Sequence, residues 1–182
     1  MAATTALTAG TWTLDAAHSE ISFTVRHAGI SKVRGNFTEF DATLVVADTL
    51  EASSVEATVQ VGSITTKDAN RDGHLKGADF FDVEQFPTME FRSTGVKGDE
   101  ENFVLVGDLT IHGVTKQVEL DVELGGQAVD AFGATRAGFS ANTKISRKEF
   151  GMTWNAALEA GGVLVSDKVV IEVEASFVLP TE

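Results

Sequence analysis

The chain contains no cysteine and no tyrosine, and only 2 prolines among its 182 residues. Without cysteine there is no disulfide, no thiolate nucleophile and no thiolate ligand for a metal. Without tyrosine the aromatic residues are 12 Phe and 2 Trp, a set that suits a dry interior. No Pro-rich or Ser-rich linker divides the sequence. We therefore interpret residues 1–182 as a single domain with a core of about 10–179.

Basic residues are scarce: 14 Lys and Arg stand against 27 Asp and Glu, which gives a formal net charge of −13. Such a surface repels phosphate backbones, so we expect no nucleic-acid partner. The first residues, MAATTALTAGTW, lack the basic and apolar regions of a secretory signal. Apolar runs such as ATLVVA are far shorter than the roughly 20 residues that span a bilayer. We expect a cytoplasmic protein with no stable membrane insertion.

Most of the chain alternates apolar and polar residues with a period of 2, as in VEATVQVGSI and VTKQVELDVEL. This pattern predicts antiparallel strands with one buried and one wet face. The expected strands are Trp12–Asp15, Glu20–His27, Lys32–Val46, Ser54–Ser63, Thr88–Val96, Phe103–Ile111, Thr115–Leu124, Ala134–Ile145 and Asp167–Val178. The first two could join through AAHS, which leaves eight. Closure removes the edges of such a sheet, so we predict an all-β, eight-stranded antiparallel barrel, with a flat sandwich as the alternative.

The alternation stops once, between Ser63 and Ser93, where polar residues are followed by a cluster of phenylalanines. Several side chains there can cap a helix, and Arg71 to Phe81 could form about three turns. We therefore predict a short helical insert near residues 68–82, weakened by Gly73 and Gly77. Pro87 returns the chain to extended geometry.

No known catalytic or metal-binding motif is present. The four histidines do not form HExxH or HxH, and GxSxG, SxxK, P-loop and GxGxxG patterns are absent. We therefore predict a binding protein with no catalytic residues, metal site or cofactor. His18 is expected to make a structural hydrogen bond with Asp15. Arg71 and His74 share one face of the predicted helix, where they could anchor the insert or form a polar collar at a barrel mouth.

Five segments in order resemble the YceI-like, polyisoprenoid-binding, lipocalin-like proteins, across roughly Gly10 to Leu179. They are WTLDAAHSEISFTVRH, KVRGNFTEFDATL, SITTKDANRDGHLKGADFFDVEQFPTMEFRS, GDLTIHGVTKQVEL and ISRKEFGM. The resemblance implies an extended lipocalin-like barrel with a small helical element. It also implies a long apolar cavity that holds an isoprenoid chain, such as a polyprenyl phosphate or the tail of a quinone. Many members look periplasmic and carry a cleavable signal, a feature that is not evident here.

The function we expect is binding, carriage or storage of such a lipid. Four polar residues are candidates to meet its head group: Arg34, Arg71, His74 and Arg147. The candidate lining of the apolar cavity is Phe23, Val25, Phe37, Phe80, Phe81, Phe86, Phe91, Leu109, Ile111, Phe139, Ile145 and Trp154. Two alternatives stay open: an enzyme acting on such a lipid, with His74 or His18 as acid or base, and a packed-barrel stress-response protein without a ligand. The sequence is also compatible with a homodimer.

Overall fold

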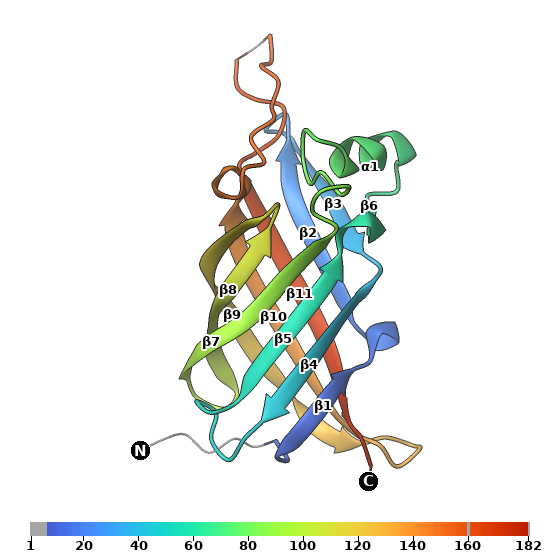
Figure 1. The fold of residues 1–182 in the computed structure, drawn as a ribbon, viewed down its shortest axis with the longest axis vertical. Coiled ribbons are helices and arrows are strands. Elements are labelled where there is room, and N and C mark those ends of the chain that lie inside the picture. Colours follow the sequence, from blue (N-terminus) through green and yellow to red (C-terminus); the bar gives the residue numbers. More distant parts are fainter. Residues whose placement is uncertain (1–6, 160, 182) are drawn as a thin grey trace.

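The computed structural model describes residues 7–159 and 161–181, which form one elongated antiparallel sheet rolled into a barrel (Figure 1). Short 3-10 turns interrupt the sheet at Ala16–His18, Val61–Ser63 and Arg147–Phe150. A single α-helix among the described residues, α1, spans Ala69–Lys76. The strands are β1 Gly10–Leu14, β2 Glu20–His27, β3 Ser31–Phe37, β4 Phe40–Val46, β5 Ser54–Gln60, β6 Ile64–Thr65, β7 Thr88–Gly98, β8 Asn102–Ile111, β9 Val114–Val129, β10 Thr135–Ser146 and β11 Lys168–Leu179.

Strand β11 closes the barrel because it is paired along both of its edges. One edge pairs with β10 over the whole strand, from Thr135↔Leu179 to Ser146↔Lys168. The other edge pairs first with β2 and then, nearer its C-terminal end, with β1 at Leu14↔Phe177. The ring therefore returns to its start, and the predicted eight-stranded antiparallel barrel is confirmed.

The 11 strand segments among the described residues form eight strands of the barrel, because three of those eight strands are each interrupted once. β1 continues into β2, β3 into β4 and β5 into β6, each pair sharing the same neighbours. The expected joining of the first two strands through AAHS is thus present, with a 3-10 turn in the middle. The unbroken strand expected over Lys32–Val46 is wrong: it bends at Thr38 and Glu39, whose backbone N–H groups bind the hydroxyl of Ser63.

The helical insert lies over one end of the barrel, between β6 and β7 (Figure 1). Asp68 caps α1, since its side chain accepts hydrogen bonds from the N–H groups of Asn70 and Arg71. The helix ends at Lys76, five residues before the predicted end at Phe81, because Gly77 leaves helical geometry. Turns then carry the chain to β7. No helix in the part of the chain that the structure describes is long and apolar enough to cross a membrane.

The opposite end of the barrel is held by a network centred on Arg136 of β10. Its Nε donates to Asp130 at 2.6 Å and its Nη1 to Asp15 at 2.7 Å. The Nδ1 atom of His18 lies 2.7 Å from the same Asp15 carboxylate, as expected from the sequence. The hydrogen bond from Arg136 is the main reason that the pKa of Asp15 and the pKa of Asp130 both lie below their usual range. The network ties the β1–β2 turn to the β9–β10 hairpin.

Replacing Arg136 by Gln should lower the thermal unfolding temperature at pH 7. Carboxyl groups with lowered pKa values stabilise the fold above the unfolded-state pKa of about 3.9, and this contribution is lost as the pH falls through the lowered values. The difference in unfolding temperature between wild type and Arg136→Gln should therefore shrink as the pH falls below about 4. Thermal unfolding followed by circular dichroism across this range measures the effect. A difference that stays constant with pH would contradict it.

Candidate functional site

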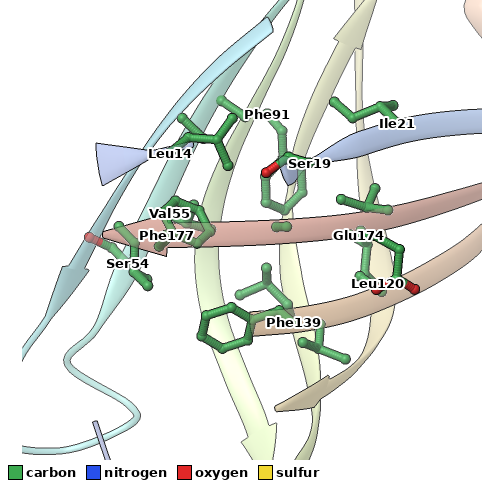
Figure 2. A pocket seen from close by; sticks show the side chains of 18 of the residues that line it. Leu14, Ser19, Ile21, Ser54, Val55, Phe91, Leu120, Phe139, Glu174 and Phe177 are labelled. Carbon is green, nitrogen blue, oxygen red and sulfur yellow. The ribbon is translucent and has the colours of Figure 1, made fainter. Parts of the chain in front are cut away.

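The interior of the barrel contains two cavities that lie end to end. The first occupies the end where β1 begins, and we call it the lower cavity; its volume is about 230 Å³. Figure 2 shows how Phe91, Phe139 and Phe177 reach into it from β7, β10 and β11. The rest of the wall is mainly aliphatic and comes from alternate residues of six further strands: Leu14, Ile21, Leu44, Val55, Leu105, Leu120 and Val122.

The second cavity, here the upper cavity, lies beneath the helical insert and the loop of residues 152–159 and 161–167, and its volume is also about 230 Å³. Its apolar wall includes Phe23, Phe37 and Phe81, whose rings lie against one another with centroids 5.7 and 6.1 Å apart. Ile21, Met89 and Ile171 line both cavities. The two spaces therefore adjoin along the barrel axis, and the interior is hollow over much of its length.

The charged residues of the lining are divided between the two cavities. The upper cavity is lined by Arg26, Arg71 and Arg147 together with two histidines, and by no acidic residue among those described. The lower cavity has no basic residue in its described lining. In a chain with a net charge of −13, this places a cluster of positive charge at one end of an apolar interior. The arrangement suits an elongated amphipathic molecule with an anionic head.

Arg147 is the most deeply buried of these charges, with 3% of its surface exposed. It follows β10 directly, and its guanidinium donates to the carbonyl groups of Met152, Trp154, Val165 and Ser166 at 2.7–3.2 Å. These four bonds use four of its five N–H groups. No carboxylate among the described residues forms an ion pair with it. The side chain therefore fixes this loop at Met152, Trp154, Val165 and Ser166, and its positive charge has no direct ion pair among the described residues.

Burial lowers the pKa of Arg147, and the charge of nearby Asp167 acts in the opposite direction. Arginine stays protonated in proteins, so the group is charged at neutral pH. Asp167 itself accepts hydrogen bonds from the hydroxyl of Ser146 at 2.7 Å and from the N–H of Lys148 at 3.1 Å, which lower its pKa. The Asp167 carboxylate thus accepts hydrogen bonds from Ser146 and Lys148, whereas the guanidinium of Arg147 donates to backbone carbonyl groups.

An aromatic cluster joins the insert to the loop above Arg147. The ring centroid of His74 lies 4.7 Å from that of Trp154 and 5.0 Å from that of Phe80. Phe80 and Trp154 contact each other at 5.3 Å, and the guanidinium carbon of Arg147 lies 5.9 Å from the Phe80 ring centroid. His74 is further held by Asp79, whose Oδ2 lies 2.9 Å from its Nε2. This cluster covers the upper cavity.

Arg71 has an anchoring role whether or not it also meets a ligand. Its Nε donates to the hydroxyl of Thr66 at 2.7 Å and its Nη2 to the Thr66 carbonyl at 2.8 Å. The hydroxyl and the N–H of buried Thr66 both donate to Asp72. Arg71 and Asp72 of α1 thus hold the helix onto the end of β6. No group of described side chains is arranged to hold a metal ion.

The structure gathers most of the predicted site residues around the two cavities. Phe91, Leu109 and Phe139 line the lower cavity. Phe86 and Arg34 line neither: Phe86 packs on the ring of His112 at 4.7 Å, and Arg34 forms an exposed ion pair with Glu172 at 3.5 Å. The larger group, which lines the upper cavity, is Phe23, Val25, Phe37, Phe80, Phe81, Ile111, Ile145, Trp154, Arg71, His74 and Arg147.

Sequence reasoning missed most of the lower cavity and the loop residues of the upper one. The inward face of β9, with Val118, Leu120 and Val122, was recognisable from its alternation with acidic residues and does line the lower cavity. By contrast, Leu164 and Val165 lie in a loop without periodicity. No sequence signal places them against the upper cavity.

An antiparallel eight-stranded barrel with an apolar hollow interior defines the lipocalin-like class of binding folds. The family model of the YceI-like domain matches residues 12–177, so the chain belongs to the YceI-like family. A UPF0312 protein of Staphylococcus aureus is 38% identical over 169 residues, which cover 91% of this chain and 96% of that protein.

Two solved structures show the same fold. A YceI protein of Campylobacter jejuni is 32% identical with a TM-score of 0.73, covering 86% of this chain and 90% of that one. A polyisoprenoid binding domain from Saccharophagus degradans, implicated in plant cell wall breakdown, has a TM-score of 0.70 at 14% identity. The match covers 93% of this chain and 98% of that domain. At that identity the likeness shows the fold alone.

Replacing Arg147 by Met should lower the free energy of unfolding by roughly 3 kcal/mol, because buried carbonyl groups lose their donor. The loss should be concentrated in the loop. We expect faster amide hydrogen exchange at residues 153–159 and 161–166, with β10 and β11 less affected. Lys148→Met, at the exposed neighbouring position, is the matched control and should change neither property. Equal effects of the two substitutions would contradict the assigned role of Arg147.

Proposed function

We propose that this protein binds and carries an isoprenoid lipid with an anionic head group, such as a polyprenyl phosphate. The observation that carries the proposal is the division of charge: the Arg147 end of the hollow interior is positive, and the described lining of the other end is mainly apolar and contains no basic residue. The apolar tail would occupy the lower cavity and continue past Ile21, Met89 and Ile171, so that the head group meets Arg147 and Arg71. The polyisoprenoid-binding domain with the same fold supports this choice of ligand.

The cavity volumes support a ligand that fills both spaces. Filling an apolar void gains roughly 24 cal/mol per Å³, so one cavity of about 230 Å³ offers roughly 5 kcal/mol. Association itself costs at least about 4 kcal/mol, which leaves little net affinity from one cavity alone. Occupation of both cavities doubles the gain to roughly 11 kcal/mol and leaves about 7 kcal/mol after the cost of association, which approaches the roughly 8 kcal/mol of micromolar binding. An extended chain can fill both cavities, whereas a compact molecule confined to one cannot.

The structure favours binding over the two alternatives. A barrel packed solid with side chains has no room for two cavities of this size. For an enzyme, His18 is badly placed, because it is exposed and bound to Asp15 and does not line either cavity. His74 lies at the upper cavity but packs edge-on against Trp154 and is paired with Asp79. The quinone of the sequence interpretation also fits the apolar wall, but its neutral carbonyl groups gain less from the buried positive charge than a phosphate does.

The head-group assignment predicts that a polyprenyl phosphate binds at least tenfold more tightly than the polyprenol of the same chain length. A hydrogen bond to a charged group contributes about 1.5–3 kcal/mol, which corresponds to roughly tenfold or more. Quenching of tryptophan fluorescence on titration measures both affinities, because Trp154 lines the upper cavity. Native mass spectrometry of the purified protein should also show a co-purifying prenyl lipid. Equal affinity for phosphate and alcohol would rule out the head-group assignment.

Blocking the lower cavity should reduce binding of long chains and spare short ones. Ala141 on β10 lines the lower cavity, and Ala141→Phe places a ring in that space. We expect at least a tenfold loss of affinity for a long polyprenyl phosphate, about 1.4 kcal/mol, and a smaller loss for a short one. Asn142→Phe puts the same ring on the exposed face of the same strand and should leave both affinities unchanged. If both variants bind like wild type, the tail does not occupy the lower cavity.

A further inference from the structure

The β2–β3 hairpin is basic on its outer face and apolar on its inner face. Arg26 is paired directly with Lys32, and Thr24 with Arg34, so three cations share the outer face of the hairpin, and Arg26 also borders the upper cavity. Val25 and Val33, the pair between them, point inward and line the upper cavity. Residues 26–34, RHAGISKVR, contain no Asp or Glu in a chain with 27 of them.

The Arg26–Lys32 pair of the basic face does not stabilise the fold. Like charges placed directly opposite on adjacent strands are destabilising, as Arg26 and Lys32 are here. Arg34 has an ion pair with Glu172, but no ion pair is formed by Arg26 or Lys32 with any described residue. Arg26 and Lys32 therefore repel each other at an exposed position and have no ion-pair partner among the described residues. This arrangement favours contact with an external anionic surface.

Exposed apolar side chains stand at the tip next to this basic face. Ile30 in the hairpin turn is 88% exposed, and Val163 in the adjoining loop is 49% exposed. Hairpin and loop are joined, since the N–H of Ala28 donates to the carbonyl of Leu164 at 2.8 Å. Leu164 and its neighbour Val165 line the upper cavity. The tip therefore adjoins the cavity that Arg147 lines.

We propose that this end of the barrel docks on the surface of an anionic lipid bilayer. Apolar residues flanked by Lys and Arg are the combination that binds such a surface, where the apolar groups enter the headgroup region and the cations contact anionic lipids. Docking would bring the upper cavity to the membrane. The choice of a bilayer over an acidic protein rests on the proposed function, because an isoprenoid lipid reaches a carrier from a membrane. The loop contributes two acidic residues among those described, Glu159 and Asp167, against the hairpin's cations, and Asp167 is bound by Ser146 and Lys148.

Flotation with vesicles that contain no isoprenoid tests the docking separately from cavity binding. Wild-type protein should float with mixed phosphatidylglycerol and phosphatidylcholine vesicles, and much less with phosphatidylcholine alone or at high salt. Each cation near the surface contributes a factor of roughly five, so Arg26→Gln with Lys32→Gln should weaken binding roughly 25-fold. The matched control, Arg92→Gln with Lys97→Gln, removes the same charge from the barrel wall, where both residues are ion-paired, and should bind like wild type.

A second pair of matched variants tests the contribution of the exposed apolar side chain at the hairpin tip to membrane docking. Ile30→Asp should abolish flotation, whereas Phe132→Asp, at a 96% exposed position in the β9–β10 hairpin at the opposite end, should not. Absence of wild-type binding to anionic vesicles, or equal behaviour of the hairpin variants and their controls, overturns the docking proposal. Titration of the same variants with detergent-dispersed polyprenyl phosphate should give wild-type affinity for Ile30→Asp. If wild-type protein does not bind polyprenyl phosphate in this titration, the proposed function is refuted, whatever the result of the flotation experiment.

Discussion

The pairing of β11 with β10 on one edge and with β1 and β2 on the other is the constraint on which the rest of the structure depends. It turns an open sheet into a ring, and a ring of eight tilted strands encloses a space that inward side chains only partly fill. The edge shared with β1 and β2 is possible because the chain turns at Ala16–His18 and then continues in the same direction. Without that double pairing, the inward face would be exposed to water.

Within the closed barrel, the two ends are built in different ways. At the β1 end, side chains bind one another, with Arg136 between Asp15 and Asp130. At the other end, Arg147 donates to backbone carbonyl groups of a loop, so its charge is buried without a direct ion pair, with Asp167 nearby. The first arrangement neutralises charge at the surface, and the second keeps a positive charge inside. Because of this difference, one end of the hollow interior is positively charged and the other is not. In our proposal this difference in charge orients the lipid.

The same asymmetry continues on the outside of the molecule. The hairpin that supplies part of the upper cavity wall through Val25 and Val33 carries Arg26 and Lys32 on its other face. Because successive residues of a strand point to opposite faces, one short segment serves both the cavity and the surface. The proposed binding and the proposed docking therefore involve the same element and, apart from Arg26, different side chains. Ile30 and Lys32 line neither cavity, so substitutions there can separate the two.

The sequence by itself determined most of the strands, their buried faces and the place of the helical insert, because period-two alternation and capping are local properties. It did not show the bend at Thr38 and Glu39 or the end of the helix at Lys76. The sequence also contained the information that Arg34 lies outside the cavity. Arg34 alternates with inward-pointing Val33 along the strand, so the period of two places its side chain on the outer face. Tertiary structure alone decided where the cavities lie, that Phe86 packs against His112, and that Arg147 is buried among carbonyl groups. Backbone carbonyls have no sequence identity, and an enclosed volume depends on how distant strands pack. Neither can be read from the order of the residues.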